Sequence, residues 1–214
     1  MKNFLLLLIY VPISTFLIAT TLLSIPHLGL DLKNIFLIWT GIGLIGGIVV
    51  FASNNFLMPF YVFAHELAHW LAAKLMRRKT SDFTVGLDSG HVKIENPNTF
   101  IALAPYLFPT YLALWFILCS ILKLFWNHPQ LPKVFFIGLG VCLAFHVVFT
   151  IKVMKSEQSD FDYAGKTSSL FLITAVNLIE VYFFYAALTG SLHNATKAII
   201  ASAQKVSQII IDFF

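Results

Sequence analysis

The chain has 214 residues, of which 58% are hydrophobic and 11% are charged, and its net charge is +4. Soluble globular domains carry about 25% charged residues, so this composition, with a mean hydropathy of +0.83, excludes an ordinary soluble domain and predicts an integral membrane protein. The basic residues lie between apolar stretches, with a main cluster at residues 77–79. This distribution is typical of membrane topology signals and speaks against a nucleic-acid partner. The length suits one compact bundle of several spans, and we expect a single integral membrane domain over residues 1–214.

The N-terminal third of the chain predicts three membrane spans. Residues 4–24 form an apolar run of about twenty residues, which is long enough to span a bilayer and too long for most signal-peptide cores. Residues 34–64 hold no charged side chain, but "SNNFLMP" at 53–59 interrupts the run with two asparagines and a proline. We therefore predict spans at 35–51 and 58–76, joined by a tight turn.

The middle of the chain contains its most polar stretch, "SDFTVGLDSGHVKIENPN" at 81–98. Apolar and polar residues alternate on both sides of Asp88-Ser89-Gly90, a pattern that predicts a β-hairpin over residues 83–95. Further spans are expected after it, at 99–124, 134–154 and 168–188.

The C-terminal tail carries isoleucines and a valine among polar residues, which predicts an amphipathic helix on the membrane surface. The predicted fold class is therefore an all-α integral membrane bundle of about six transmembrane helices. A small β-hairpin and a C-terminal amphipathic helix complete it.

The span at 58–76 contains "HELAH", the pattern His-Glu-x-x-His. Residues four apart share one helix face, so His65 and His69 can present two imidazole nitrogens to one metal ion. Glu66 lies beside them and can take a proton from water at the metal. An ionisable residue in a membrane span is costly and marks a functional candidate. The alternative is that neighbouring helices satisfy these polar side chains, as in transporters.

Zinc (Zn²⁺) is the expected metal for two histidines, a carboxylate and one open position. The signature lies close to the basic cluster at 77–79, which the positive-inside rule places in the cytoplasm. Lys152 and Lys155 bring the chain back to the same membrane face two spans later. A third ligand from the segment after Lys155 would therefore approach the histidines from the correct side.

Asp160, in "QSDFDYAG", is the first choice for the third ligand, and Asp162 is the second. In the alternative interpretation, one or both of these aspartates only cap the next helix and bind no metal. Glu180, an acid in the middle of the last predicted span, is a third candidate. Glu95 ranks lower because it lies in the predicted hairpin. Among the other histidines, His91 is of interest because it lies in the same hairpin.

Four motifs stand together in the middle of the chain: "HELAH" at 65–69, "TVGLDSGHVKIE" at 84–95, "LAPYLFP" at 103–109 and "SDFDYAG" at 159–165. With them the sequence resembles the site-2 protease family of intramembrane zinc metalloproteases, in particular its minimal, single-domain branch. The resemblance implies a zinc ion held by His65, His69 and Asp160, with Glu66 as the catalytic base. It also implies that the hairpin pairs with an unwound stretch of substrate. The better known branches have glycine directly after the third ligand, whereas this chain has Phe161.

The expected function is therefore a zinc metalloendopeptidase that hydrolyses peptide bonds in or near transmembrane segments of membrane-protein substrates. We expect a multi-pass protein of the cell (cytoplasmic) membrane, embedded in the lipid bilayer, with its active site near the cytoplasmic face. One alternative is another membrane zinc peptidase, of the CAAX-processing or quality-control type, with Glu95 or Glu180 as the third ligand. Another is a membrane protein that binds metal without catalysis, or a transporter.

Overall fold

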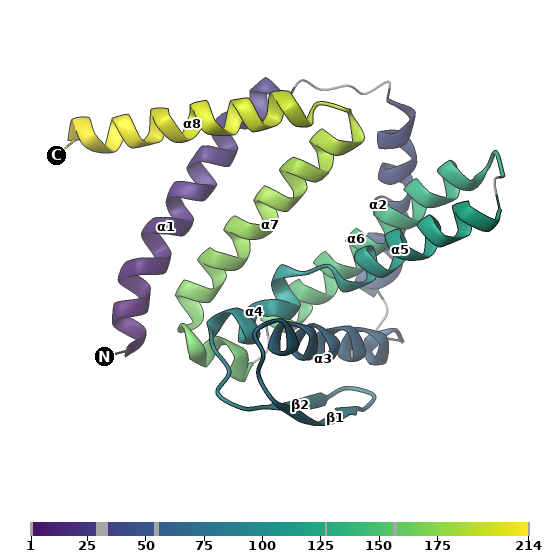
Figure 1. The fold of residues 1–214 in the computed structure, drawn as a ribbon, viewed down its shortest axis with the longest axis horizontal. Helices are drawn as coiled ribbons and strands as arrows, with labels where there is room; N and C mark the ends of the chain where they lie inside the picture. The colour runs from purple at the N-terminus through teal and green to yellow at the C-terminus, as the bar shows by residue number, and fades with distance from the viewer. Residues whose placement is uncertain (1, 29–33, 54–55, 127, 156–157, 214) are drawn as a thin grey trace. The chain divides into compact units, whose positions relative to one another are not determined.

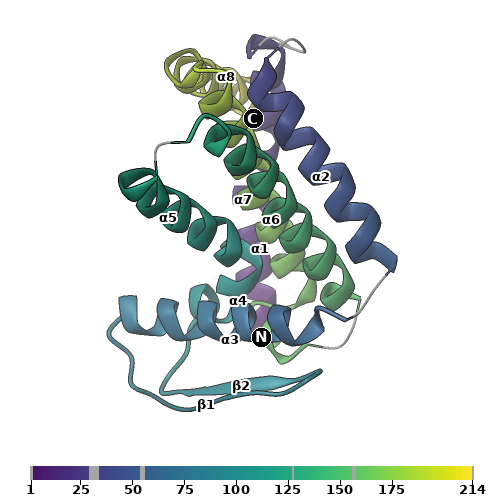
Figure 2. The same ribbon diagram turned by 90° about the vertical axis from the view of Figure 1, so that its right-hand side faces the viewer.

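A computed structural model describes residues 2–28, 34–53, 56–126, 128–155 and 158–213. Within these ranges the chain forms eight α-helices, two short 3-10 helices and one two-stranded antiparallel sheet (Figures 1 and 2). The predicted helical fold with one small hairpin is confirmed. The helices divide into two compact units, Met1–Leu37 with Ala164–Phe214, and Ile38–Tyr163. The expectation of a single domain stays a prediction.

The unit formed by the two ends of the chain contains α1 (Lys2–Ser24), η1 (Ile25–His27), α7 (Lys166–Leu188) and α8 (Leu192–Phe213). Helix α1 packs against both α7 and α8. Gly190, with φ of 69°, permits the tight turn between α7 and α8, because a residue without a side chain adopts this conformation at little cost.

The predicted C-terminal amphipathic helix corresponds to α8. One face of this helix is buried and consists mainly of small residues, Ala195, Ala198, Ser202 and Val206. The Tyr182 hydroxyl donates a hydrogen bond of 3.0 Å to the Ala195 carbonyl, which fixes the start of α8 on α7. Its isoleucines at 209–211 are exposed, and its position on a membrane surface stays a prediction.

In the other unit, α2 (Ile35–Ser53) crosses α6 (Leu131–Met154) at very short range. A Cβ atom at Gly43 would clash with the Ile137 carbonyl, and one at Gly140 would clash with the Thr40 carbonyl. Glycine at both positions therefore lets the two backbones meet, as small residues commonly do between membrane helices.

Helix α3 (Met58–Leu75) carries the His-Glu-x-x-His pattern and ends in a left-handed turn. Arg77 has φ of 56°, and the Arg78 N–H donates to the Ala73 carbonyl at 2.8 Å. This hydrogen bond satisfies a carbonyl that the end of the helix leaves without a helical partner. The turn sends the chain back along α3 as the hairpin.

The hairpin consists of β1 (Thr80–Val85) and β2 (Gly90–Ile94), and both strands pack on α3 (Figure 1). The prediction of a hairpin over 83–95 is confirmed, although the first strand begins at Thr80. The pairing register shifts between Ser81 and Thr84, where Asp82 has φ of 52°, so the strand contains a bulge.

After the hairpin, α4 (Thr99–Leu107) and α5 (Thr110–Phe125) replace the single predicted span at 99–124. The two helices meet at an angle of 61°. Pro109 causes the break because it has no N–H and disfavours helical geometry in the residue before it. Phe108 accordingly has an extended backbone, with φ of −114° and ψ of 115°.

The number of membrane spans is lower than predicted. Among the described residues, four helical segments are long and apolar enough to cross a membrane, namely Leu5–His27, α2, α6 and α7. The bent pair α4 and α5 makes a fifth if it counts as one span. Helix α3 does not qualify, because its two histidines, glutamate and lysine reduce its hydropathy.

Two further details concern the predicted boundaries. Helix α6 begins at Leu131 and not at 134, because Pro132 lies in its first turn, where no N–H is required. The asparagines at 54 and 55, in the predicted turn, lie outside the described residues.

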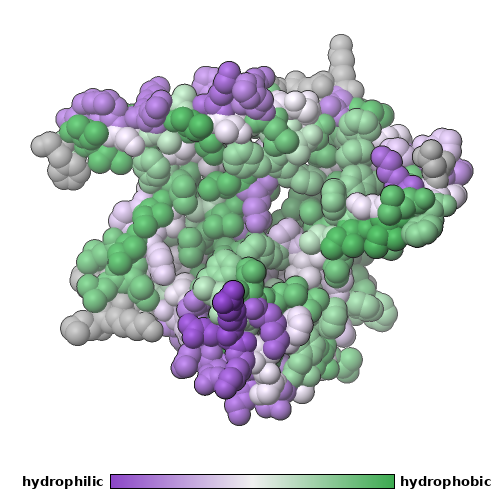
Figure 3. Space-filling view, in the orientation of Figure 1, coloured by the Kyte–Doolittle hydropathy of each residue, from purple (hydrophilic) through white to green (hydrophobic). Residues whose placement is uncertain are grey.

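The surface agrees with a membrane protein. Figure 3 shows hydrophobic residues over much of the helical surface, and hydrophilic residues gathered where the hairpin and the end of α3 lie and along α8. Large apolar side chains stand exposed along α5, including Phe116 at 57% and Leu124 at 80%. Such a continuous apolar surface is unusual for a soluble monomer and suits contact with lipid.

The glycine-mediated crossing of α2 and α6 can be tested with Gly140→Ala. We expect the added methyl group to clash with the Thr40 carbonyl and to lower the free energy of unfolding by about 1–3 kcal/mol. Gly46→Ala is the matched control, because nothing lies within 4 Å of its added Cβ atom and both changes gain similar helix propensity. Thermal unfolding of the detergent-solubilised protein, followed by circular dichroism, measures the difference. Equal stability of the two variants would contradict the close crossing.

Candidate metal centre

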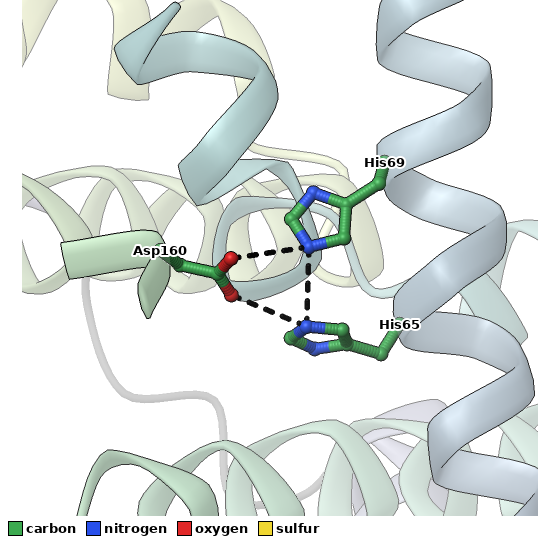
Figure 4. A group of neighbouring side chains, drawn as sticks. All are labelled: His65, His69 and Asp160. Atoms are coloured by element: carbon green, nitrogen blue, oxygen red, sulfur yellow. Dashed lines mark hydrogen bonds and ion pairs between the residues drawn. The ribbon is translucent and has the colours of Figure 1, made fainter. Parts of the chain in front are cut away.

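Helix α3 presents His65 and His69 on one face, as their spacing predicts (Figure 4). Their Nε2 atoms lie 3.2 Å apart, and His69 is buried. The two imidazole rings meet edge to face, with centroids 4.7 Å apart. Two nitrogens therefore converge on one point.

Asp160 completes the group from the short 3-10 helix η2 (Ser159–Tyr163). Its Oδ2 lies 3.2 Å from His65 Nε2, and its Oδ1 lies 3.5 Å from His69 Nε2. All three ligand atoms fall within 4.8 Å of one another. Within the described part of the chain, this is the one group of histidine, cysteine or acidic side chains with the proximity that a metal ion requires.

Phe161, the residue directly after Asp160, fixes the direction of the carboxylate. Its side chain is buried and packs against the Tyr106 ring of α4, with centroids 5.2 Å apart. In a 3-10 helix with about three residues per turn, neighbouring residues point to different sides. Burial of Phe161 against α4 therefore directs Asp160 toward α3.

The donor set fits zinc. Zinc binds imidazole nitrogen and carboxylate oxygen at about 2.0–2.2 Å with tetrahedral geometry, which places neighbouring ligand atoms about 3.3 Å apart. The two Nε2 atoms lie 3.2 Å apart, and each lies near a different oxygen of Asp160, at 3.2 Å from Oδ2 for His65 and at 3.5 Å from Oδ1 for His69. With one oxygen counted for Asp160, the three ligand atoms lie within 4.8 Å of one another, close enough for one ion. Three protein ligands are also the number that catalytic zinc sites use, with the fourth position open.

A second layer of hydrogen bonds orients the three side chains. His69 Nδ1 donates to the Ile101 carbonyl at 2.8 Å, which directs Nε2 toward the other two ligands. The Tyr61 hydroxyl lies 3.3 Å from His65 Nδ1, and the Tyr106 hydroxyl donates to Asp160 Oδ2 at 2.8 Å. Such outer partners fix ligand geometry in metal sites.

Pro105 explains why the Ile101 carbonyl is available to His69. In an α-helix this carbonyl would accept the N–H of the residue four positions later, which is Pro105 and has no N–H. The carbonyl is therefore left without its helical partner, and Ile101 is fully buried. His69 supplies the missing donor.

The charge of Asp160 also suits a metal ligand. Burial alone would raise the pKa of this carboxyl, but hydrogen bonds from His65 and His69 outweigh it and hold the pKa well below its usual range. Asp160 is therefore an anion at neutral pH, which is the form that coordinates a metal.

Glu66 lies beside the group and lines the same cleft, which has a volume of about 360 Å³. The other walls of this cleft come from β2, from Pro97 and the start of α4, and from residues 158–160 with Tyr163. The Glu66 side chain is buried, and no hydrogen bond or ion pair with another described residue engages its carboxylate. A Cβ atom at Gly90 would lie 2.9 Å from Glu66 Cγ, so glycine lets β2 lie directly on the glutamate.

The remaining candidate residues do not join the group. Asp162 lies in η2, but it does not belong to the group formed by His65, His69 and Asp160. Glu180 belongs to α7 in the other unit, and Glu95 is exposed after β2. His91 pairs across the hairpin with Thr84, whose Oγ1 lies 2.8 Å from its Nδ1.

Sequence reasoning missed the second layer of the site. Tyr61 lies four residues before His65 on the same helix face, so its contact could have been predicted from spacing. Pro105 and Tyr106 stand inside the quoted motif "LAPYLFP", and the proline itself marks a carbonyl without a helical donor. The contact between Tyr106 and Asp160 has no such local signal.

Comparisons with models of protein families, with curated proteins and with solved structures give no match for this chain. The interpretation of the site therefore depends on its own geometry.

The ligand set predicts the metal content of variants. The protein purified in detergent and incubated with zinc should hold about one ion per chain, and His65→Ala, His69→Ala and Asp160→Ala should lose it. Asp162→Ala and Glu180→Ala should keep the ion, because neither carboxylate belongs to the group. Elemental analysis by mass spectrometry measures the content. Zinc retained by Asp160→Ala, or no zinc uptake by the parent protein, would contradict this ligand set.

The hydrogen bond from Tyr106 predicts a weaker metal site in Tyr106→Phe. Loss of the hydroxyl frees Asp160 to rotate, so we expect a zinc affinity about 10–100-fold lower, as for other outer-layer partners. Tyr111→Phe is the control, because its hydroxyl donates to the Phe60 carbonyl and not to a ligand. Competition with a zinc-binding dye measures both affinities. Equal affinities would remove Tyr106 from the site.

Proposed function

We propose that this protein is an intramembrane zinc metalloprotease, similar to the site-2 protease family, that hydrolyses peptide bonds in or near transmembrane segments of membrane-protein substrates. The observation that carries the proposal is the convergence of His65, His69 and Asp160 beside Glu66. A purely structural metal site would need no carboxylate such as Glu66, which lines an open cleft beside the ligands.

The residues of the cleft have separate roles in this proposal. His65, His69 and Asp160 hold zinc, which when bound polarises a carbonyl and lowers the pKa of water. A Glu66 carboxylate oxygen takes the proton of the attacking water and later gives it to the nitrogen of the leaving amine. The absence of a hydrogen-bond partner for Glu66 among the described residues supports this role, because its oxygens are available to a water molecule.

The hairpin binds the substrate in an extended conformation. A transmembrane helix hides its backbone in its own hydrogen bonds, so it must open locally before a peptide bond reaches the metal. Four residues of β2 line the cleft, namely Gly90, His91, Val92 and Ile94. The substrate pairs with this strand as an additional strand, through main-chain hydrogen bonds.

The active site lies near the cytoplasmic face of the cell membrane. Arg77, Arg78 and Lys79 follow Met76, the residue after α3, and basic residues near apolar membrane segments favour the cytoplasmic side. In this arrangement α3 lies within the membrane, where α4 covers one of its sides. Water reaches the metal along the cleft wall formed by residues 158–160.

The peptidase alternatives with another third ligand have less support. Glu95 is exposed, and neither it nor Glu180 belongs to the group of converging ligand atoms. A protein that binds metal without catalysis would tolerate the loss of the Glu66 charge. The following experiment separates this alternative from the protease.

Glu66→Gln should abolish peptide cleavage and keep the zinc ion. Loss of the general base should lower the rate by at least about a hundredfold, while the metal ligands stay in place. The parent and the variant, both zinc-loaded and in liposomes, are incubated with a library of synthetic transmembrane peptides, and the products are identified by mass spectrometry.

Glu95→Gln provides the matched control, because it makes the same chemical change at an exposed site outside the cleft. It should cleave at the parent rate. Equal cleavage by zinc-loaded Glu66→Gln would remove Glu66 from the proposed role. A zinc-loaded parent that cleaves no peptide would favour the non-catalytic alternative.

A further inference from the structure

A second cavity lies between the end of α5 and the start of α6 and shares no residue with the metal cleft. The two helices pack side by side (Figure 2). The cavity has a volume of about 560 Å³, within the range of about 300–1,000 Å³ that is usual for small-molecule sites. It is therefore large enough for part of an amphiphile.

The inner surface of this cavity is apolar. Cys119 and Leu131 form part of the lining and are only 4% and 7% exposed. Phe116, Phe135 and Phe136 add aromatic surface. Hydrocarbon would gain favourable burial against these side chains.

Two hydrogen-bond donors, Lys123 and His128, also line the cavity. Lys123 is exposed and has no ion pair or hydrogen bond with any other described residue. His128 Nδ1 accepts the Gln130 N–H at 3.2 Å, so the proton of the neutral imidazole lies on Nε2. The Trp126 ring stacks on the imidazole, with centroids 4.9 Å apart, and holds its orientation. An ammonium and an N–H donor thus line the same cavity.

The residues that line the cavity include one lysine, Lys123, and no acidic residue. The sequence that contains them, residues 96–156, has no aspartate or glutamate. No acidic side chain in this part of the sequence can neutralise Lys123. An anionic ligand at Lys123 would therefore meet no competing carboxylate from these residues.

Exposed apolar residues of α5 beside the cavity indicate the source of its ligand. Ile117, Ile121 and Leu124 on the same helix are exposed, and Figure 3 shows hydrophobic surface beside a small hydrophilic group at this end of the helices. An exposed apolar surface on a helix of a membrane protein faces lipid. A ligand that enters from this side is a component of the bilayer.

We propose that this cavity binds an anionic phospholipid. The acyl chain lies against Phe116 and Phe135, and the phosphate accepts hydrogen bonds from the Lys123 ammonium and His128 Nε2. Charge-assisted hydrogen bonds of this kind are stronger than neutral ones. The proposal does not depend on the proposed protease function.

The test uses the full chain in a neutral detergent and measures lipid binding by native mass spectrometry. Phosphatidylglycerol and phosphatidylcholine with identical acyl chains are titrated separately, and phosphatidylglycerol should bind more tightly. Lys123→Ala should weaken phosphatidylglycerol binding about tenfold, the effect of losing one charge-assisted hydrogen bond. Ser120→Trp, which fills the cavity from its wall, should weaken both lipids without lowering the melting temperature.

Lys133→Ala is the matched control. Lys133 lies outside the cavity, with its ammonium 4.3 Å from the centre of the Trp39 ring, so the variant loses the same charge nearby and should bind as the parent does. Equal weakening by Lys123→Ala and Lys133→Ala would show general surface attraction and overturn the proposal. Equal binding of the two lipids would overturn it too. Displacement of the lipid by glycerol phosphate alone would identify a free anion as the ligand and reject the phospholipid.

Discussion

The site depends on placing one carboxylate, Asp160, against two imidazoles within an apolar bundle. A buried carboxylate is costly unless hydrogen bonds or opposite charges compensate it. The compensation comes from His65 and His69 on one side and from the Tyr106 hydroxyl on another. Helices α3 and α4 must therefore hold fixed positions around η2. Helix α4 packs against α3 and against η2, and these contacts provide the arrangement.

Helix α4 connects the two halves of the site because it is short and contains a proline. Pro105 leaves the Ile101 carbonyl without a helical donor, and His69 takes that place. Pro109 then ends the helix, so that α5 leaves at 61°. A helix with another residue at position 105 would have kept the Ile101 carbonyl in its own hydrogen bonding. Pro105 is thus what makes this carbonyl available to orient His69.

The hairpin brings a polar strand to Glu66 in an otherwise apolar region. Its proximity depends on Gly90, where any side chain would meet Glu66 and Val62. The same strand contributes Gly90, His91, Val92 and Ile94 to the lining of the cleft. In the proposed protease, an extended substrate along β2 would pass the candidate metal ligands and Glu66 together. The geometry places this strand, the three candidate ligands and Glu66 around one cleft of about 360 Å³.

The sequence by itself determined the membrane character, the hairpin and the pairing of His65 with His69, because composition and spacing along one helix or strand are local properties. It left Asp160, Asp162 and Glu180 as alternatives and predicted too many spans. Only the tertiary structure brought Asp160 to the histidines, through the burial of Phe161 against Tyr106. Such a contact joins segments that are distant in the chain, and its energy comes from packing and the pairing of buried polar groups. The sequence pattern of α4 or of η2 alone shows neither this packing nor this pairing.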